Sequence, residues 1–493
     1  MESLKICFVS SEVSPFAKTG GLADVAAALP AALKAMDQDV RLMMPKYRMI
    51  NDRKYVLRDV IRLREVKVDL GGKVRIASGK TAFLPNTKVH VYFLSIPEIF
   101  DRKGIYQDPA TGKDFEDNAE RFAYFSKAVL ETLKLLYWQP DIIHCNEWQT
   151  ALIPYYLKTT YAEEEFFSGT KTVLTLHNLA YQGIFPIELA KQLNIAEEEV
   201  QPGGAFEFNG QINLIKGGIL YADVLNTVSE RYAEEITTSP EYGFGLEAVL
   251  QQRKKDLFGI LNGVDYSVWN PETDRYLPEK YDAKSLDKKV ENKKALCAQF
   301  KLPFKETTPL IGMVTRLVEQ KGIDLVIEGM EAIMKRGVQL VILGTGEEKY
   351  QHALQSLAEK YPQQLAVYFK FDEKSAHLIE GGADMFLMPS RFEPCGLNQM
   401  YSLKYGTVPI VRETGGLADT VENFDPQSGK GTGFTFKEYA VDAMLEAIDR
   451  ALETFQDKAT WVKIQKAGMR KDFSWENSAK KYLKLYEKAK KKK

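Results

Sequence analysis

The chain has 493 residues, more than one hydrophobic core usually holds, so at least two domains are expected. Its 66 Lys and Arg residues nearly balance 67 Asp and Glu residues, and no run approaches the length of a membrane span, so neither nucleic acid nor a membrane is an expected partner. Four isolated cysteines, five scattered histidines and an N-terminus without a signal-peptide pattern indicate a cytoplasmic protein with no metal site and no cofactor.

Short apolar runs alternate with helical patterns along the first half of the chain. The predicted strands cover residues 5–10, 39–45, 89–96, 141–146, 171–177 and 223–229. A helical pattern such as that of residues 22–36 lies between them. Continuous apolar strands joined by helices predict a parallel sheet that is covered on both faces.

The second half repeats this organisation after a polar, turn-rich stretch at residues 260–289, which we interpret as a linker. Its predicted strands cover residues 309–316, 338–344, 365–371, 384–390 and 408–413. The expected fold is therefore α/β, with two Rossmann-like, doubly wound domains at residues 1–265 and 266–493. An amphipathic helix at about 473–493 can pack back on the N-terminal domain.

The six residues TGGLAD occur twice, each time before a helical pattern. The first copy holds Gly20 and Gly21 and directly follows Lys18; the second holds Thr414 and Gly415 and directly follows an apolar strand. Glycines before a helix free backbone N–H groups for an anion, and the helix N-terminus adds partial positive charge. The alternative is that each Gly-Gly pair only makes a tight turn.

Arg316 and Lys321 are five residues apart, just after an apolar strand. Ligands of open α/β sheets bind at the carboxyl ends of strands, and an Arg with a Lys can neutralise a diphosphate. Two solvated surface cations are the alternative. They would stand at a helix start, where the helix dipole disfavours them.

The segment "PSRFEPCGLNQM" follows another predicted strand and opens a helix. Glu393 can hold sugar hydroxyls there, while the N–H groups of Gly396 and Leu397 can hold phosphate. Glu393 can equally be a capping residue that stabilises the helix.

Two further strand ends carry polar residues. His177 ends one strand, and Glu147 and Trp148 follow another. An aromatic ring beside polar groups suits a sugar, although a buried histidine or tryptophan is more often part of a core. The segment "GTGEEK" lacks the third glycine of a dinucleotide fingerprint, which argues against an NAD-dependent oxidoreductase.

Six motifs in this order carry a resemblance over essentially the whole chain: "KTGGLADV", "TLHNLAYQG", "ILNGVD", "TRLVEQKG", "PSRFEPCGL" and "TGGLADTV". Together they resemble the bacterial glycogen synthases and plant starch synthases. The resemblance implies a GT-B fold with a central cleft between the two domains. It also implies a retaining glucosyltransferase that transfers glucose from ADP-glucose to the non-reducing end of an α-1,4-glucan, by front-face displacement without a protein nucleophile.

The resemblance also implies roles for individual residues. Arg316 and Lys321 match the diphosphate clamp, and Glu393 matches the acid that binds glucose hydroxyls and stabilises charge at the anomeric carbon. His177 and Asn262 match residues that contact the donor sugar. The remaining matched positions are, on the donor side, Lys18, Gly20, Gly21, Phe371 (stacked on the base), Gly396, Leu397, Thr414 and Gly415, and on the acceptor or sugar side, Tyr106, Glu147 and Trp148.

Two positions depart from the common bacterial pattern. The chain reads "HCNEW" where many members read HAHDW, so Glu147 replaces an Asp, and Phe371 stands where many members have Tyr. The Phe371 departure leaves UDP-glucose open as the donor. Further alternatives are another sugar substrate for the same enzyme class and a non-catalytic glucan or nucleotide-sugar sensor. The sequence gives no basis for predicting the oligomeric state.

Overall fold

The computed structural model describes residues 3–370 and 372–492. The chain folds into two compact units. Unit 1 comprises Met1–Val228, Ala233–Gly263 and Trp475–Lys493, and unit 2 comprises Ser229–Tyr232 and Val264–Ser474. In the described part of the chain no helix is long and apolar enough to cross a membrane.

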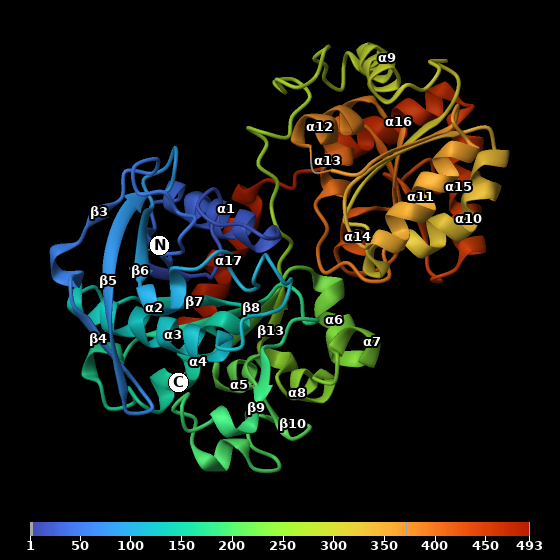
Figure 1. The fold of residues 1–493 in the computed structure, drawn as a ribbon. Helices are drawn as coiled ribbons and strands as arrows, with labels where there is room; N and C mark the ends of the chain where they lie inside the picture. The colour runs from blue at the N-terminus through green and yellow to red at the C-terminus, as the bar shows by residue number, and fades with distance from the viewer. Residues whose placement is uncertain (1–2, 371, 493) are drawn as a thin grey trace. The chain divides into compact units, whose positions relative to one another are not determined.

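Unit 1 is built on a ten-stranded sheet in the order β13-β12-β8-β7-β1-β2-β6-β5-β3, with β4 paired to β5 (Figure 1). The strands from β13 to β6 in this order are all parallel. They are β1 (Lys5–Val9), β2 (Asp39–Pro45), β6 (His90–Ser95), β7 (Ile142–Asn146), β8 (Lys171–Leu176), β12 (Val224–Thr227) and β13 (Leu257–Gly259). Every strand predicted in the first half is present, and among these parallel strands only the three-residue β13 was not predicted.

An antiparallel extension on one edge of this sheet was also not predicted. It consists of β3 (Arg58–Asp59), β4 (Val66–Leu70) and β5 (Lys73–Phe83), and β5 runs antiparallel to β6. Gly71 and Gly72 connect β4 to β5 with φ of 60° and 81°, which glycine adopts without strain. Burial alternates along β4, as expected for a strand with one face in the core.

Helices and a small second sheet complete unit 1 (Figure 1). The helices are α1 (Gly21–Ala35), α2 (Pro97–Phe100), α3 (Asn118–Leu135), α4 (Leu152–Lys158), α5 (Leu214–Tyr221), α6 (Glu230–Thr238, which begins in unit 2), α7 (Pro240–Gly243), α8 (Glu247–Gln252) and α17 (Trp475–Lys490). The small sheet has the order β10 (Glu207–Phe208), β11 (Gln211–Asn213), β9 (Ile184–Pro186).

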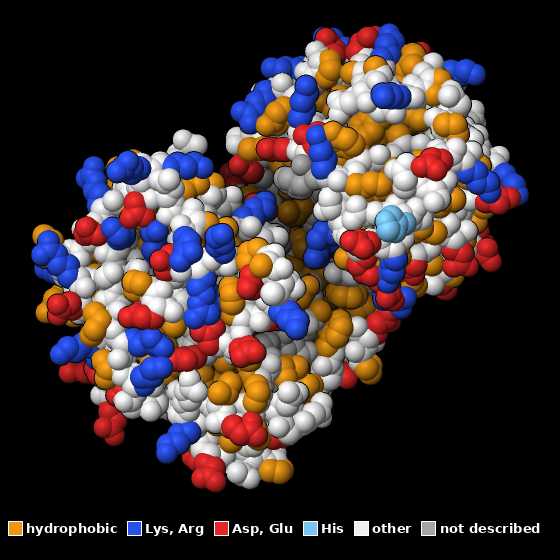
Figure 2. Space-filling view, viewed as in Figure 1, with side chains coloured by type: hydrophobic (Ala, Val, Ile, Leu, Met, Phe, Trp, Pro, Cys, Tyr) orange, Lys and Arg blue, Asp and Glu red, His pale blue; other side chains and the backbone are white. Residues whose placement is uncertain are grey.

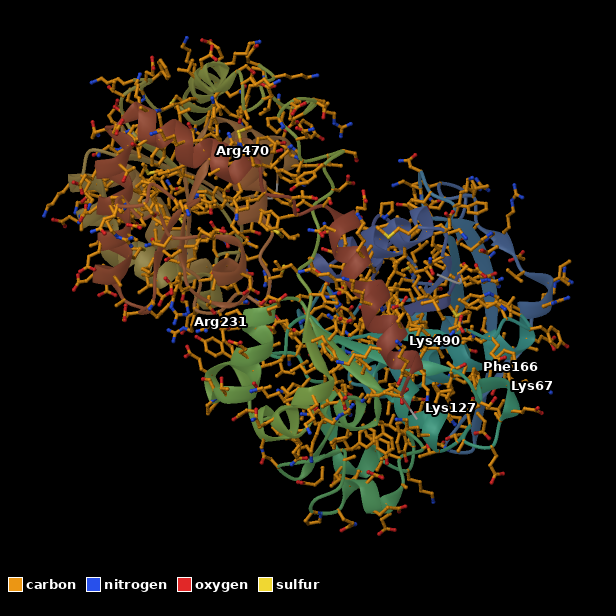
Figure 3. The ribbon with its side chains drawn as sticks, turned by 180° about the vertical axis from the view of Figure 1, so that it is seen from behind. Lys67, Lys127, Phe166, Arg231, Arg470 and Lys490 are labelled. Carbon is orange, nitrogen blue, oxygen red and sulfur yellow. The ribbon has the colours of Figure 1, made fainter. Side chains whose placement is uncertain are left out.

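Helix α17 is the last helix of the chain and belongs to unit 1. It contacts α1, β7 and β8, and its C-terminal end lies at Lys490, labelled in Figure 3. The buried Tyr486 hydroxyl is 2.7 Å from Nδ1 of His144, and Lys490 forms an ion pair of 2.8 Å with Asp141. The chain therefore leaves unit 1 after Gly263 and returns to it at Trp475.

Unit 2 is built on a six-stranded parallel sheet in the order β16-β15-β14-β17-β18-β19. The strands are β14 (Leu310–Val314), β15 (Gln339–Leu343), β16 (Leu365–Tyr368), β17 (Met385–Met388), β18 (Val408–Arg412) and β19 (Phe434–Phe436). The helices are α9 (Lys289–Phe300), α10 (Ile323–Lys335), α11 (Glu348–Lys360), α12 (Glu373–Gly382), α13 (Asn398–Tyr405), α14 (Gly415–Thr420), α15 (Val441–Phe455) and α16 (Lys458–Met469). Only β19, with three residues, was not predicted, and the two-domain α/β fold with parallel sheets is confirmed.

The stretch interpreted as a linker is largely folded onto unit 2. Trp269 stacks between His377 and Tyr401, with ring centroids 3.7 and 3.9 Å away. Asp274 accepts a hydrogen bond from Tyr405 and lies 2.7 Å from Nδ1 of His377, and all three side chains are buried. This polar and aromatic packing explains why so turn-rich a segment is ordered.

No single charge dominates the face of the molecule that Figure 2 shows. On the face shown in Figure 2, basic and acidic side chains are interspersed over both units. This agrees with the nearly balanced composition of the chain.

Candidate active site

The first TGGLAD turn is held by Glu12, a residue that the sequence reasoning missed. Its buried carboxylate accepts hydrogen bonds from the backbone N–H groups of Thr19 and Gly20 and from the Thr19 hydroxyl. Tyr106 donates its hydroxyl to the same carboxylate at 2.7 Å, and burial raises the pKa of Tyr106 well above 10. The N–H groups expected to face an anion therefore face a carboxylate of the chain itself.

Gly20 and Gly21 lie in open space. Gly20 precedes α1 with an extended backbone (φ −149°), and a Cβ added to either glycine would meet no atom within 4 Å. Neither backbone conformation nor packing within the described residues requires these two glycines. Close approach of a ligand to the backbone is a remaining reason for them.

Lys18, next to this turn, is exposed and forms an ion pair with Asp24 of α1 at 2.7 Å. Both side chains are more than 40% exposed, so the pair contributes little to stability. The ammonium group is therefore free to exchange this partner for a ligand at small cost.

Strands β7 and β8 bring three further polar residues together at their carboxyl ends. Glu147 follows β7 with φ of 62°, a left-handed conformation that is uncommon outside glycine. Its buried carboxylate accepts hydrogen bonds from the backbone N–H groups of His177 and Asn178, at 2.5 and 3.0 Å. Burial raises the pKa of Glu147 to about 8. Glu147 thus holds the backbone at the end of β8, where His177 begins the loop.

The hydrogen bonds around His177 define its tautomer. Asn146 donates its side-chain N–H to the carbonyl of Val9, so its oxygen is an acceptor for Nε2 of His177 at 2.9 Å. Burial lowers the pKa of His177 to about 3, so the ring is neutral at ordinary pH. Nε2 then carries the proton, and Nδ1 presents a lone pair that can accept a hydrogen bond from a hydroxyl.

The remaining unit 1 residues differ in character. Trp148 is packed between the rings of Phe122 and Phe185, as a core residue would be, and Gly183 leaves it room. Asn262 is buried, and its side-chain oxygen has no hydrogen-bond partner among the described residues. Because an unsatisfied buried oxygen is costly, Asn262 is the stronger candidate for a ligand contact.

In unit 2 the central feature is an ion pair between Lys321 and Glu393. Lys321 ends the short turn that follows β14, and Glu393 follows β17, the strand next to β14 in the sheet. Nζ of Lys321 is 2.6 Å from Oε2 of Glu393, and the side chains are 17% and 8% exposed. Ser390 donates a further hydrogen bond to Oε2 at 3.1 Å. The pair thus joins a cation and a carboxylate at the carboxyl edge of the parallel sheet.

The capping interpretation of Glu393 is wrong. Helix α13 begins at Asn398, its N-cap residue is Leu397, and no side chain caps it. Gly396 precedes the helix with φ of 70°, and a Cβ there would lie 2.6 Å from the side-chain oxygen of Gln399. The carboxylate of Glu393 is instead engaged by Lys321 and Ser390.

Arg316 lies two residues after β14 and is exposed, and among the described residues its guanidinium has no hydrogen-bond or ion-pair partner. Its loop is supported by the "GTGEEK" segment. A Cβ on Gly344 or Gly346 would lie within 2.2 Å of the carbonyl oxygen of Thr315 or Leu317. The glycines of that segment therefore serve backbone packing beside Arg316. Phe371 lies outside the described residues.

The second TGGLAD copy differs from the first. Thr414 is the N-cap residue of α14, and Gly415 and Gly416 are buried. A Cβ on Gly415 would lie 2.0 Å from the carbonyl oxygen of Glu393, and the N–H of Gly416 donates to that oxygen at 3.1 Å. This copy therefore packs directly against the Glu393 loop, whereas the first copy is exposed.

Comparison with known proteins agrees with these features. The profile described as "Starch synthase catalytic domain" matches residues 5–252, and that described as "Glycosyl transferases group 1" matches residues 298–467. A protein of Koribacter versatilis named "Glycogen synthase" is 46% identical over 99% of this chain and 98% of its own length. One of the same name from Thermotoga maritima is also 46% identical, over 99% of each chain.

Two solved structures are similar over nearly the whole chain. The catalytic domain of starch synthase IV from Arabidopsis thaliana, bound to ADP and acarbose, has a TM-score of 0.89 at 32% identity and covers all of both chains. Sucrose-phosphate synthase from Thermosynechococcus elongatus, at 18% identity and a TM-score of 0.58 over 98% of each chain, shares the fold alone. The chain is a GT-B-type glucosyltransferase and belongs to the glycogen and starch synthase family.

Proposed function

We propose that this enzyme transfers glucose from ADP-glucose to the non-reducing end of an α-1,4-glucan in the cytoplasm, with retention of configuration. The observation that carries the proposal is the ion pair of Lys321 and Glu393 at adjacent strand ends of unit 2. It supplies one positive charge for a departing diphosphate and one negative charge for the glucosyl group that the diphosphate leaves. Residues 266–493 form the donor side of the enzyme. Residues 1–265 form the acceptor side and add contacts to the donor sugar.

Donor binding in this proposal depends on two cations. Arg316 is exposed and unpaired among the described residues, so its planar guanidinium can contact two phosphate oxygens at once. Lys321 adds a point charge and is already fixed by Glu393. Gly396, Leu397, Thr414 and Gly415 would contribute backbone N–H or hydroxyl contacts to the same donor.

In unit 1, the neutral ring of His177 accepts a sugar hydroxyl at Nδ1, while its backbone carbonyl faces the anomeric centre. The orphaned oxygen of Asn262 accepts a second hydroxyl. Tyr106, assigned to the acceptor side, is held by its hydrogen bond to Glu12 at the first glycine turn. Glu147 acts through the backbone it holds, and Lys18 contributes charge at the turn.

The proposed chemical step needs no protein nucleophile. The bond between the anomeric carbon and the diphosphate oxygen breaks, and O4 of the acceptor forms the new bond on the same face. The departing phosphate oxygen takes the acceptor proton, so charge and protons balance. Positioning and charge stabilisation by Arg316, Lys321 and Glu393 then lower the barrier.

The similar Arabidopsis starch synthase holds ADP and acarbose, which supports an adenine nucleotide and a glucan-like acceptor here. The test is transfer from labelled ADP-glucose to glycogen, followed by cleavage with an α-1,4-specific amylase. Release of the label as maltose or glucose supports the linkage and its configuration. Label that resists the amylase would contradict the proposal.

A further inference from the structure

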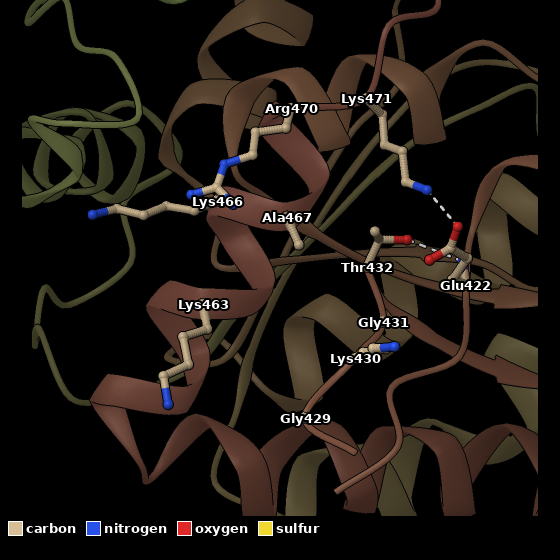
Figure 4. A pocket seen from close by; sticks show the side chains of 10 residues that line it. All are labelled: Glu422, Gly429, Lys430, Gly431, Thr432, Lys463, Lys466, Ala467, Arg470 and Lys471. Atoms are coloured by element: carbon tan, nitrogen blue, oxygen red, sulfur yellow. Dashed lines mark hydrogen bonds and ion pairs between the residues drawn. The ribbon is translucent and has the colours of Figure 1, made fainter.

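Unit 2 contains a pocket of about 510 Å³ that none of the candidate site residues lines. It lies between α16, the turn after this helix and the loop that precedes β19 (Figure 4). Its charged lining residues are Glu422, Lys430, Lys463, Lys466, Arg470 and Lys471. Arg470, at the end of α16, is also labelled in Figure 3.

The charges of this pocket are strongly unbalanced. Five cationic side chains stand against one carboxylate, in a chain whose total charge is −1. Glu422 is already paired with Lys471, as the dashed line in Figure 4 shows. Among the described residues, Lys430, Lys463, Lys466 and Arg470 have no ion-pair partner. The pocket is therefore lined by four cationic side chains that form no ion pair among the described residues.

Local helix energetics do not account for this cluster. Lys463, Lys466 and Arg470 follow one another at spacings of three and four residues, so they share one face of α16 and its end (Figure 4). Like charges at these spacings destabilise a helix, and α16 contains no acidic residue to offset them. The helix dipole favours cations only in the last turn, which leaves Lys463 unexplained.

The opposite wall is a preformed loop. The Asp425 carboxylate accepts hydrogen bonds from the N–H groups of Gln427 and Ser428, and the carbonyl of Lys430 accepts one from the N–H of Asp425 at 2.8 Å. A Cβ on Gly431 would lie 2.3 Å from Cα of Phe424, so the loop packs closely against the backbone of Phe424. Lys430 therefore lies on the wall of the pocket opposite α16, while the acid of its loop is engaged.

A second acid close to α16 is also engaged. Asp457 caps the far end of α16, where it accepts hydrogen bonds from Ala459 and Thr460. Neither of these neighbouring carboxylates lines the pocket. An anion from solvent can therefore enter among the cations of the pocket without displacing either acid.

We propose that this pocket is a second ligand site that binds a small anion with two or more phosphate groups. The volume falls within the range of small-molecule sites. Cations from two separate elements, helix and loop, suit an anion whose charges are spread over several phosphoryl oxygens. A single phosphate carries about two negative charges, fewer than the four cations that line the pocket without an ion pair. The site is separate from the donor clamp, because neither Arg316 nor Lys321 lines it.

The test is calorimetric titration of the full chain with inorganic phosphate, pyrophosphate and tripolyphosphate in turn. Binding is measured with Arg316→Gln as the background, so that an anion held by the proposed donor clamp does not contribute. We expect affinity to rise along the series and to fall as KCl is added. In this background the double substitution Lys466→Gln and Arg470→Gln should weaken tripolyphosphate binding about tenfold or more.

The matched control is Lys335→Gln with Lys360→Gln. It removes two lysines from unit 2 that share Glu331 and lie outside the pocket. The control should bind tripolyphosphate as its parent does. Equal weakening in both double variants would show a general charge effect, and absence of binding at millimolar tripolyphosphate would show that the pocket takes no such anion; either result overturns the proposal.

This test is independent of the proposed enzymatic activity. Without added anion, the pocket double variant made in the wild-type chain should transfer glucose at the wild-type rate. Binding lost with transfer retained would support a separate site. Transfer lost in this variant would instead place the two residues in the donor machinery and contradict the proposal.

Discussion

Substitution of Lys321 should show how much the ion pair with Glu393 contributes to the stability of the fold. The substitution Lys321→Met leaves the carboxylate, which is 8% exposed, with only the Ser390 hydroxyl as a partner among the described residues. An uncompensated buried charge costs about 3–5 kcal/mol, and the 17% exposure of Lys321 favours the lower end, about 3 kcal/mol. Glu393→Gln should cost about 2 kcal/mol, because the ammonium group of Lys321 reaches solvent more easily.

The double variant Lys321→Met with Glu393→Gln measures the coupling between the two. We expect it to cost about 2 kcal/mol, which leaves a coupling energy of about 3 kcal/mol. Urea unfolding followed by circular dichroism gives the stabilities. Lys335→Met, in an exposed pair with Glu331, is the control and should change stability by less than about 0.5 kcal/mol. Additive effects of the two single substitutions would refute this description of the pair.

Catalysis should respond differently from stability. Each single substitution should lower kcat by about 10²–10³-fold, because it removes a group that stabilises charge in the transition state. The double variant should remain as inactive as the singles, although its stability partly recovers. Recovery of kcat in the double variant would show that the two groups matter only for the fold.

The remaining predictions concern the two glycine turns, the orphaned amide and the histidine. Gly416→Ala should destabilise the protein by about 1–3 kcal/mol, because its Cβ would lie 2.0 Å from a carbonyl oxygen. Gly20→Ala should leave the urea midpoint unchanged and lower only the transfer rate, because a Cβ there meets no atom within 4 Å. Asn262→Leu should leave the Tm equal or higher, because it removes a buried unsatisfied oxygen. It should also raise KM for the donor. A lower Tm with unchanged KM would contradict this prediction. The pKa of His177 is about 3 in the folded protein and 6.5 in the unfolded one. The free energy of unfolding should therefore fall as the pH drops from about 6.5 towards 3, and this fall should be less steep in His177→Gln. Because the ring stays neutral down to about pH 3, the pH profile of the transfer rate should show no inflection near pH 6.5 that belongs to His177.

The parallel strands were predictable because each is a continuous apolar run between helical patterns. Residues 39–45 and 408–413, for example, became β2 and β18 within one residue. The β4–β5 hairpin was missed, although Gly71-Gly72 between alternating residues was a usable signal. The three-residue strands β13 and β19 are too short to show any periodicity.

The candidate site was predictable as a set of strand ends but not as a set of contacts. Arg316, Lys321 and Glu393 were found because charged residues directly follow apolar strands. The pairing of Lys321 with Glu393 depends on β14 and β17 being neighbours, which sequence order does not reveal. Glu12 was missed because its partners, the amides of the glycine turn, are backbone groups that leave no mark on composition.

The two identical motifs show the same limit. The sequence left both open as anion-binding turns or tight turns, and both begin helices. One leaves its glycines open and exposed, and the other buries them against the backbone of Glu393. Identical residues thus serve different structural needs, and only the surroundings of Gly20 and Gly415 distinguish them.

Glucose transfer to glycogen from labelled ADP-glucose and UDP-glucose, measured side by side, tests the central proposal most directly. Arg316→Ala serves as the control, since it removes the exposed cation assigned to the diphosphate. We predict transfer from ADP-glucose, a much lower rate from UDP-glucose, and loss of both in Arg316→Ala. Preference for UDP-glucose would overturn the donor, and absence of transfer from either would contradict the proposed function.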